Sequence, residues 1–150
     1  MSSVAPIDRF FHHYPRTLDA KNRVTIPSRW RDVDLEEMFA LADGKQGILK
    51  LLPREELERM GRKVLELPDF DANRARNFRR QLFSQSVLCP VDKQGRMLLP
   101  ASMLESLGLA GEVMLVGVGE RVEVWDPQRW QDQSAAQAEL FESISEEIGF

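Results

Sequence analysis

The 150-residue chain has a single cysteine, Cys89, so it can form neither an intrachain disulfide nor a cysteine-rich zinc site. Cys89 precedes a proline and is expected to be a small buried side chain. The chain also lacks any run near the roughly 18 apolar residues that cross a bilayer. Its first residues lack the basic start and apolar stretch of a signal peptide. We therefore expect a soluble, cytoplasmic protein with no membrane partner.

Signatures of catalysis are missing as well. The chain has no G-x-S-x-G motif, no P-loop, and no His/Cys spacing typical of a metal site. His12 and His13 are neighbours that would face opposite sides of a strand, which suits neither a metal pair nor a catalytic base. We expect no enzyme activity, no cofactor, no bound metal and no small-molecule substrate.

Charges are segregated along the chain, although the net charge is only −4. Residues 9–31 and residues 73–96 each hold six basic residues against one acidic residue, a local charge of +5. Residues 132–150 hold five acidic residues and no basic one, and this segment is expected to be disordered or to shield basic surfaces of neighbouring subunits. The net charge argues against indiscriminate coating of nucleic acid, whereas the basic windows favour a localised contact.

An internal repeat runs through the chain with a constant offset of 73 residues. Aligning LDAKNRVTIP with VDKQGRMLLP matches Asp19 with Asp92 and Arg23 with Arg96. Later strands and a helix start follow the same offset, which chance does not readily produce. We divide the chain into a first repeat (9–68), a linking helix (69–86), a second repeat (87–131) and an acidic C-terminal helix or tail (132–150).

Each repeat is expected to contain a hairpin, a short helix, a second hairpin and a longer helix. Ser28 can cap a brief helix that ends at Asp32, Pro53 suits a first helical position, and Asp71 can cap the linking helix. The expected strands are 16–18, 24–26, 39–42, 48–52, 87–91, 97–99, 113–116 and 122–125. The other expected helices are 53–67, 101–108 and 127–140.

The two Asp-x-x-x-Arg segments have the composition of three-residue hairpin loops. Asp is favoured before a type I turn, and Asn22 and Gly95 are residue types that readily adopt the positive φ needed at the end of such a loop. Turn geometry does not explain the arginine that follows, or the additional Lys21 and Lys93. Exposed Lys and Arg on a rigid tip suit phosphates and base edges, where an arginine fork can pair with guanine.

Two interpretations compete with DNA binding. In one, each Asp and Arg form only a surface ion pair that closes the turn, worth about 0 to 1 kcal/mol. In the other, the hairpins are subunit interfaces of a self-assembling protein and DNA has no role. The occurrence of the hairpin in two separate basic windows favours DNA binding, with the aspartates as scaffold. The candidate DNA contacts are Arg16, Asp19, Lys21, Arg23, Asp92, Lys93 and Arg96.

In DAKNR (19–23), DKQGR (92–96) and VEVWDPQRW, the chain resembles the MraZ family, whose two AbrB-like halves each carry a D-x-x-x-R motif. The resemblance extends from about Phe10 to about Trp130. Asn22 stands where the family usually has glycine, although asparagine can adopt the same turn.

This resemblance implies an α+β fold in which two AbrB-like repeats form a double-split (swapped-hairpin) β-barrel with peripheral helices. It also implies a cytoplasmic, nucleoid-associated transcriptional regulator of the division and cell-wall gene cluster. The expected partners are double-stranded DNA, at tandem promoter repeats, and further copies of the chain in a ring-shaped homo-oligomer.

Overall fold

A computed structural model describes residues 8–31 and 35–150. Its strands are β1 (His13–Thr17), β2 (Arg23–Thr25), β3 (Glu37–Asp43), β4 (Ile48–Leu52), β5 (Val87–Pro90), β6 (Arg96–Leu98), β7 (Glu112–Gly117) and β8 (Val122–Trp125). Its helices are α1 (Arg54–Lys63), α2 (Ala72–Gln85), α3 (Ala101–Leu107), α4 (Pro127–Ala136) and α5 (Ala138–Ile148), with 3-10 turns at Ser28–Trp30 and Val64–Glu66.

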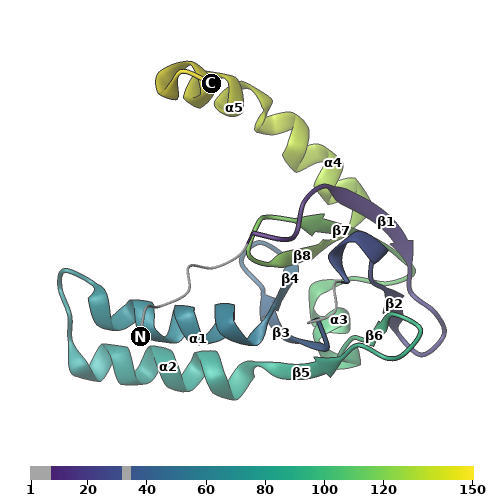
Figure 1. Cartoon of the computed structure of the whole chain (residues 1–150), viewed down its shortest axis with the longest axis horizontal. Coiled ribbons are helices and arrows are strands. Elements are labelled where there is room, and N and C mark those ends of the chain that lie inside the picture. The colour runs from purple at the N-terminus through teal and green to yellow at the C-terminus, as the bar shows by residue number, and fades with distance from the viewer. Residues whose placement is uncertain (1–7, 32–34) are drawn as a thin grey trace.

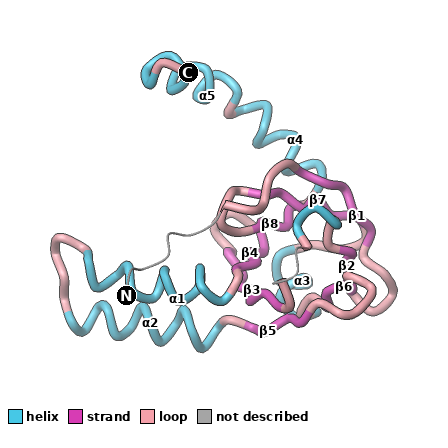
Figure 2. The backbone as a smooth tube through the Cα atoms, viewed as in Figure 1, coloured by secondary structure: helices cyan, strands magenta, loops and turns pink. Residues whose placement is uncertain are grey.

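The strands form a body from which two helical arms extend (Figures 1 and 2). One arm is the hairpin of α1 and α2, and the other consists of α4 followed by α5. None of the helices among the described residues is long and apolar enough to span a membrane. The expected α+β class is confirmed.

The two repeats exchange their outer strands. A six-stranded sheet has the order β1-β7-β8-β4-β3-β5, and every pairing in it is antiparallel. Under the 73-residue offset β1 corresponds to β5 and β7 to β3, so the pairings β1 with β7 and β5 with β3 are equivalent. The sheet is open, with β1 and β5 at its edges. A closed double-split β-barrel therefore stays a prediction.

A two-stranded ribbon of β2 and β6 covers one side of the shared core. Val24 of β2 and Met97 of β6 are fully buried and belong to the same apolar cluster as Leu49 and Leu115 of the sheet. Both repeats thus contribute to one core, which fixes the position of the ribbon relative to the sheet.

The helical arms begin largely as the sequence indicates. The carboxylate of Asp71 caps α2 by accepting from the backbone N–H groups of Asn73 and Arg74. Asp126, immediately before Pro127, caps α4 by accepting from the backbone N–H of Arg129. The expected helix over 127–140 is instead divided into α4 and α5, so the acidic segment is helical and not disordered.

Two expected helix starts are wrong in detail. Ser28 does not act as a cap: the 3-10 turn is closed by the Trp30 N–H, which donates to the carbonyl oxygen of Pro27 over 2.9 Å. Asp32, the expected end of this helix, lies outside the described residues. Pro53 precedes α1 in an extended conformation with ψ 157°, and its carbonyl accepts the first helical hydrogen bonds.

The expectation that His12 and His13 face opposite sides of a strand is wrong. His12 lies before β1 with φ 73°, so it does not continue the strand, and its ring stacks on that of His13 with centroids 4.6 Å apart. The His13 ring also lies 5.7 Å from that of Trp130 in α4. Among the described residues no cluster of three or more His, Cys, Asp or Glu could hold a metal ion. Cys89 is 2% exposed, as expected, and burial raises the pKa of its thiol to about 11.

Candidate nucleic-acid interface

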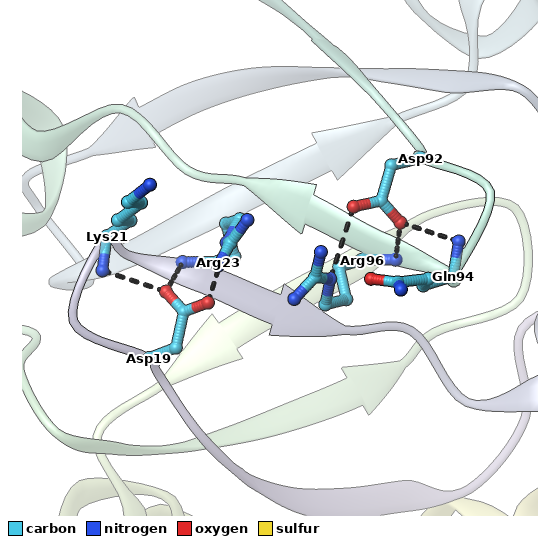
Figure 3. A network of polar contacts seen from close by, with 6 residues as sticks. All are labelled: Asp19, Lys21, Arg23, Asp92, Gln94 and Arg96. Atoms are coloured by element: carbon cyan, nitrogen blue, oxygen red, sulfur yellow. Dashed lines mark hydrogen bonds and ion pairs between the residues drawn. The ribbon is translucent and has the colours of Figure 1, made fainter.

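The first Asp-x-x-x-Arg segment is a closed loop between β1 and β2 (Figure 3). The Asp19 N–H donates to the Arg23 carbonyl over 3.0 Å, and the Asn22 N–H donates to the Asp19 carbonyl over 2.9 Å. Oδ1 of Asp19 accepts from the backbone N–H groups of Lys21 (2.9 Å) and Arg23 (2.8 Å). Oδ2 accepts from Arg23 Nε over 2.6 Å. One carboxylate therefore closes the turn and orients the guanidinium.

The second segment repeats these contacts between β5 and β6 (Figure 3). Oδ1 of Asp92 accepts from the backbone N–H groups of Gln94 and Arg96, each over 2.9 Å, and Oδ2 accepts from Arg96 Nε over 3.2 Å. Gly95 ends the loop with φ 80°, as Asn22 does in the first loop with φ 64°. The predicted turn geometry, with positive φ before each arginine, is confirmed.

Both aspartates are stabilised in their ionised form. The backbone N–H of Arg23 lowers the pKa of Asp19, and the Arg23 side chain and the Lys21 N–H contribute in the same direction. The backbone N–H of Arg96 likewise lowers the pKa of Asp92. The predicted Asp–Arg ion pairs therefore exist in both hairpins. Because the Asp19 and Asp92 side chains are 35% and 41% exposed, solvent screens both pairs.

The ion pairs leave the outer part of each guanidinium unused. In both arginines the aspartate engages Nε, and among the described residues nothing hydrogen-bonds the terminal nitrogens of Arg23 or Arg96. Each arginine side chain is 31% exposed. The terminal nitrogens are the part of a guanidinium that forms a bidentate contact with a base or phosphate. The terminal nitrogens of both arginines are thus accessible for such a contact.

The two arginines share the outer face of the β2–β6 ribbon. In the register, Arg23 lies opposite Leu98 and Arg96 lies opposite Thr25. Side chains alternate between the faces of a strand, and Val24 and Met97 between them point into the core. We call Arg23, Thr25, Arg96 and Leu98 the ribbon face. The two loops lie at opposite ends of this ribbon, with both guanidinium groups between them (Figure 3).

The remaining candidate contacts have different surroundings. Lys21 and Lys93 are exposed within the loops. Arg16 of β1 is bound to backbone oxygens: its Nε donates to the Thr25 carbonyl over 3.0 Å and its Nη1 to the Pro15 carbonyl over 2.9 Å. Arg16 therefore lies beside the ribbon and ties β1 to β2, whereas the lysines extend the basic surface beyond its ends.

One basic residue near the site was missed in the sequence. The exposed side chain of Arg31 lies against the second loop, so that a Cβ atom added to Gly95 would be 2.5 Å from Arg31 Cζ. Arg31 belongs to the first basic window but not to the repeated motif. Local charge therefore marks it as a candidate, whereas only the tertiary structure brings it to the other repeat.

Comparison with known proteins gives the chain a family. A family model described as "MraZ protein, putative antitoxin-like" matches it twice, over residues 10–81 and 82–149, which confirms the internal duplication. A relative named Transcriptional regulator MraZ from Heliobacterium modesticaldum is 37% identical over 139 residues, 93% of this chain and 96% of the relative.

Two further relatives carry the same name. The relative from Carboxydothermus hydrogenoformans is 38% identical over 139 residues, 93% of this chain and 96% of the relative. The relative from Symbiobacterium thermophilum is 36% identical over 137 residues, 91% of this chain and 98% of the relative. These names describe regulators and not enzymes. The resemblance seen in the two Asp-x-x-x-Arg motifs thus extends over almost the whole chain, and the chain belongs to the MraZ family.

Proposed function

We propose that this chain is a transcriptional regulator that binds double-stranded DNA through the ribbon face. The observation that carries the proposal is the pair Arg23 and Arg96, which lie on one exposed face with their terminal nitrogens unpaired. The name shared by the relatives, Transcriptional regulator MraZ, supports the regulatory role.

The major groove of B-DNA admits a two-stranded β-ribbon. With the ribbon face against the groove, the forks of Arg23 and Arg96 pair with the O6 and N7 acceptors of guanine. Lys21, Lys93 and Arg16 contact phosphates around the ribbon, because phosphate contacts position a protein on the duplex. Asp19 and Asp92 do not meet DNA directly: they hold the two arginines in a fixed orientation before binding.

One ribbon is short, and a single copy should therefore bind weakly. We propose that several copies assemble into a ring-shaped homo-oligomer and engage tandem promoter repeats about one helical turn apart, so that effective concentration raises the affinity. In this proposal the repeats 9–68 and 87–131 are the halves of a double-split β-barrel, 69–86 links them and 132–150 forms a C-terminal helical segment. The protein is cytoplasmic and nucleoid-associated, and it regulates the division and cell-wall gene cluster.

An electrophoretic mobility series on the promoter upstream of its own gene tests the DNA contact. The variant Arg23→Ala with Arg96→Ala should bind at least tenfold more weakly, because each well-made arginine contact is worth about 1 to 3 kcal/mol. The control Lys45→Ala with Arg62→Ala removes two exposed positive charges outside the ribbon and its loops, and should bind like the wild type.

Two outcomes count against this function. If the folded Arg23→Ala with Arg96→Ala variant keeps its promoter affinity and the salt dependence of binding, the ribbon face is not the DNA contact. If the variant instead loses its oligomeric mass in light scattering, the hairpins are subunit interfaces, as the alternative interpretation requires.

A further inference from the structure

Helix α5 carries an apolar stripe that is largely exposed. Its Phe141 meets the Phe150 ring edge-on, with centroids 6.4 Å apart, and lines a groove with Trp130 of α4. Leu140, Phe141, Ile144 and Ile148 recur at helical spacing and are 53%, 64%, 45% and 73% exposed. The helix lies at the end of an arm that leads away from the sheet (Figure 1). A contiguous exposed apolar face of this kind marks an interaction surface.

The other side of α5 is acidic. Between Ala138 and Ile148 the helix has four carboxylates, Glu139, Glu142, Glu146 and Glu147, and no basic residue. Within the described chain none of the four has an ion-pair partner. A surface that receives α5 should therefore combine an apolar floor with positive charge.

A surface with these properties lies along α2, on the other helical arm. A groove of about 540 Å³ runs between α2, α3 and β3, with Leu41, Phe78, Leu82 and Met103 among its lining residues. At Phe78 it meets a second groove of about 460 Å³ against the C-terminal end of α1. Phe78 is itself 44% exposed. The two grooves together form an apolar track along the side of α2, which we call the α2 groove.

The charge of α2 is opposite to that of α5. Between Ala72 and Gln85 it has four arginines and no acidic residue. Arg74 of α2 and Lys63 of α1 line the α2 groove directly, whereas Arg76, Arg79 and Arg80 lie elsewhere on the helix. Asp69 and Asp71 also line the groove, at its loop end, where the Asp71 carboxylate is bound to the N-terminus of α2. As whole helices α2 is positive and α5 is negative, whereas the residues that line the groove carry two charges of each sign.

The two repeats differ in how their longer helices are covered. In the first repeat α2 folds back, and Leu82 packs on Leu57 of α1. Leu57 corresponds to Trp130 of α4 under the 73-residue offset. Trp130 is only partly buried, and α5 continues outward instead of folding back over it. Among the described residues, no helix therefore packs on α4 as α2 packs on α1.

We propose that α5 of one copy docks with its apolar stripe in the α2 groove of a second copy. This is a helix-in-groove contact, in which apolar side chains at helical spacing supply the anchors and opposite charges fix the partner and its orientation. Each copy offers one α5 and one α2 groove, so the contact is heterologous and propagates until a ring closes or a chain of copies forms. The inference rests on the assembly part of the proposed function and is independent of the DNA contacts.

Light scattering on the full chain in the absence of DNA tests this contact with two complementary variants. The α5 variant is Phe141→Glu with Ile144→Glu, and the groove variant is Arg74→Glu with Phe78→Glu. Each should be monomeric on its own, with the circular dichroism of a folded protein. An equimolar mixture should form a 1:1 dimer and nothing larger, because only one intact α5 and one intact groove remain to meet.

Two controls keep the result specific. Ser143→Glu adds one negative charge to α5 outside the apolar stripe and should keep the wild-type mass. Arg23→Ala with Arg96→Ala should also keep that mass while losing DNA binding, so a failure of the DNA contact can be told from a failure of assembly. The inference is overturned if the wild type is monomeric, if either folded variant keeps the wild-type mass, or if the mixture stays monomeric.

Discussion

Glu56 of α1 accepts a hydrogen bond from Arg121 of the β7–β8 turn, with 3.2 Å between Oε2 and Nη1. Glu56 is 2% exposed and also pairs with Arg59 over 2.8 Å. At the equivalent position of the second repeat, 73 residues further on, Arg129 of α4 donates to the Gly47 carbonyl in the β3–β4 turn over 3.0 Å. In each repeat, a side chain near the start of a helix therefore bonds to a turn of the other repeat. The first repeat uses the anionic Glu56 and the second uses the cationic Arg129.

Removal of this buried carboxylate should destabilise the whole molecule. In the variant Glu56→Gln, Arg121 loses its carboxylate partner and Arg59 keeps only the longer contact with Glu120. Breaking a fully buried ion pair costs about 3 kcal/mol or more. Because both arginines are 29% exposed, we expect a smaller loss of about 1 to 3 kcal/mol in the free energy of unfolding measured by urea denaturation.

A weaker neighbouring pair supplies the control. Glu120 is 33% exposed and lies 3.4 Å from Arg59, so Glu120→Gln should cost less than about 1 kcal/mol. Equal urea midpoints for Glu56→Gln and Glu120→Gln would show that the buried carboxylate does not hold the repeats together.

The positive φ of the two loops gives a second prediction. Asn22→Gly should leave the thermal midpoint nearly unchanged, because glycine adopts φ 64° without cost. Asn22→Ala should cost about 1 kcal/mol, since a Cβ disfavours the left-handed region and asparagine tolerates that region better than alanine does. Gly95→Ala should cost more, because its Cβ must also displace the Arg31 side chain. The loss of thermal stability should be largest for Gly95→Ala, smaller for Asn22→Ala and smallest for Asn22→Gly. Any other order would contradict the loop geometry.

Local chemistry of the sequence was sufficient for the hairpin loops. Asp19 and Asn22 have few conformations that satisfy their side chains and backbone, so the turn follows from residue type and spacing alone. The cap at Asp71 was predictable for the same reason, since a carboxylate satisfies the free N–H groups of a first helical turn. The Ser28 cap failed because the Pro27 carbonyl already closes that turn.

Features that depend on distant parts of the chain were not predictable. The exchange of β1 and β5 between the repeats leaves no local signal, because apolar alternation reports burial and not the identity of the neighbouring strand. The ribbon face requires the register of Arg23 against Leu98, which is set by core packing of both repeats. His12 was misplaced because nothing in its sequence context marks the positive φ that stacks it on His13.

Acid should weaken the fold in part through the two hairpins. The folded-state pKa values of Asp19 and Asp92 lie below the ordinary value of 3.8, so their contribution is complete above about pH 4 and is lost as the pH falls through the lowered values. In the variant Asp19→Asn with Asp92→Asn this contribution is absent at every pH. Urea unfolding at a series of pH values should therefore show a smaller loss of stability below about pH 4 for the variant than for the wild type. Parallel losses would exclude stabilisation by the ionised aspartates.

Exchange of arginine for lysine separates charge from base recognition in the ribbon face. Lysine keeps the positive charge of Arg23 and Arg96 but lacks the planar fork, so it cannot present two parallel donors to guanine. In the variant Arg23→Lys with Arg96→Lys, the slope of log affinity against log salt should differ from the wild-type slope by less than about 0.9. This is the contribution of one phosphate contact. The preference for promoter repeats over unrelated DNA should fall by at least tenfold, as loss of a bidentate pair costs about 1 to 3 kcal/mol per site. Competition binding at several salt concentrations measures both quantities on the same samples. If the lysine variant retains the preference, Arg23 and Arg96 act only as charges, and sequence is read by another part of the surface.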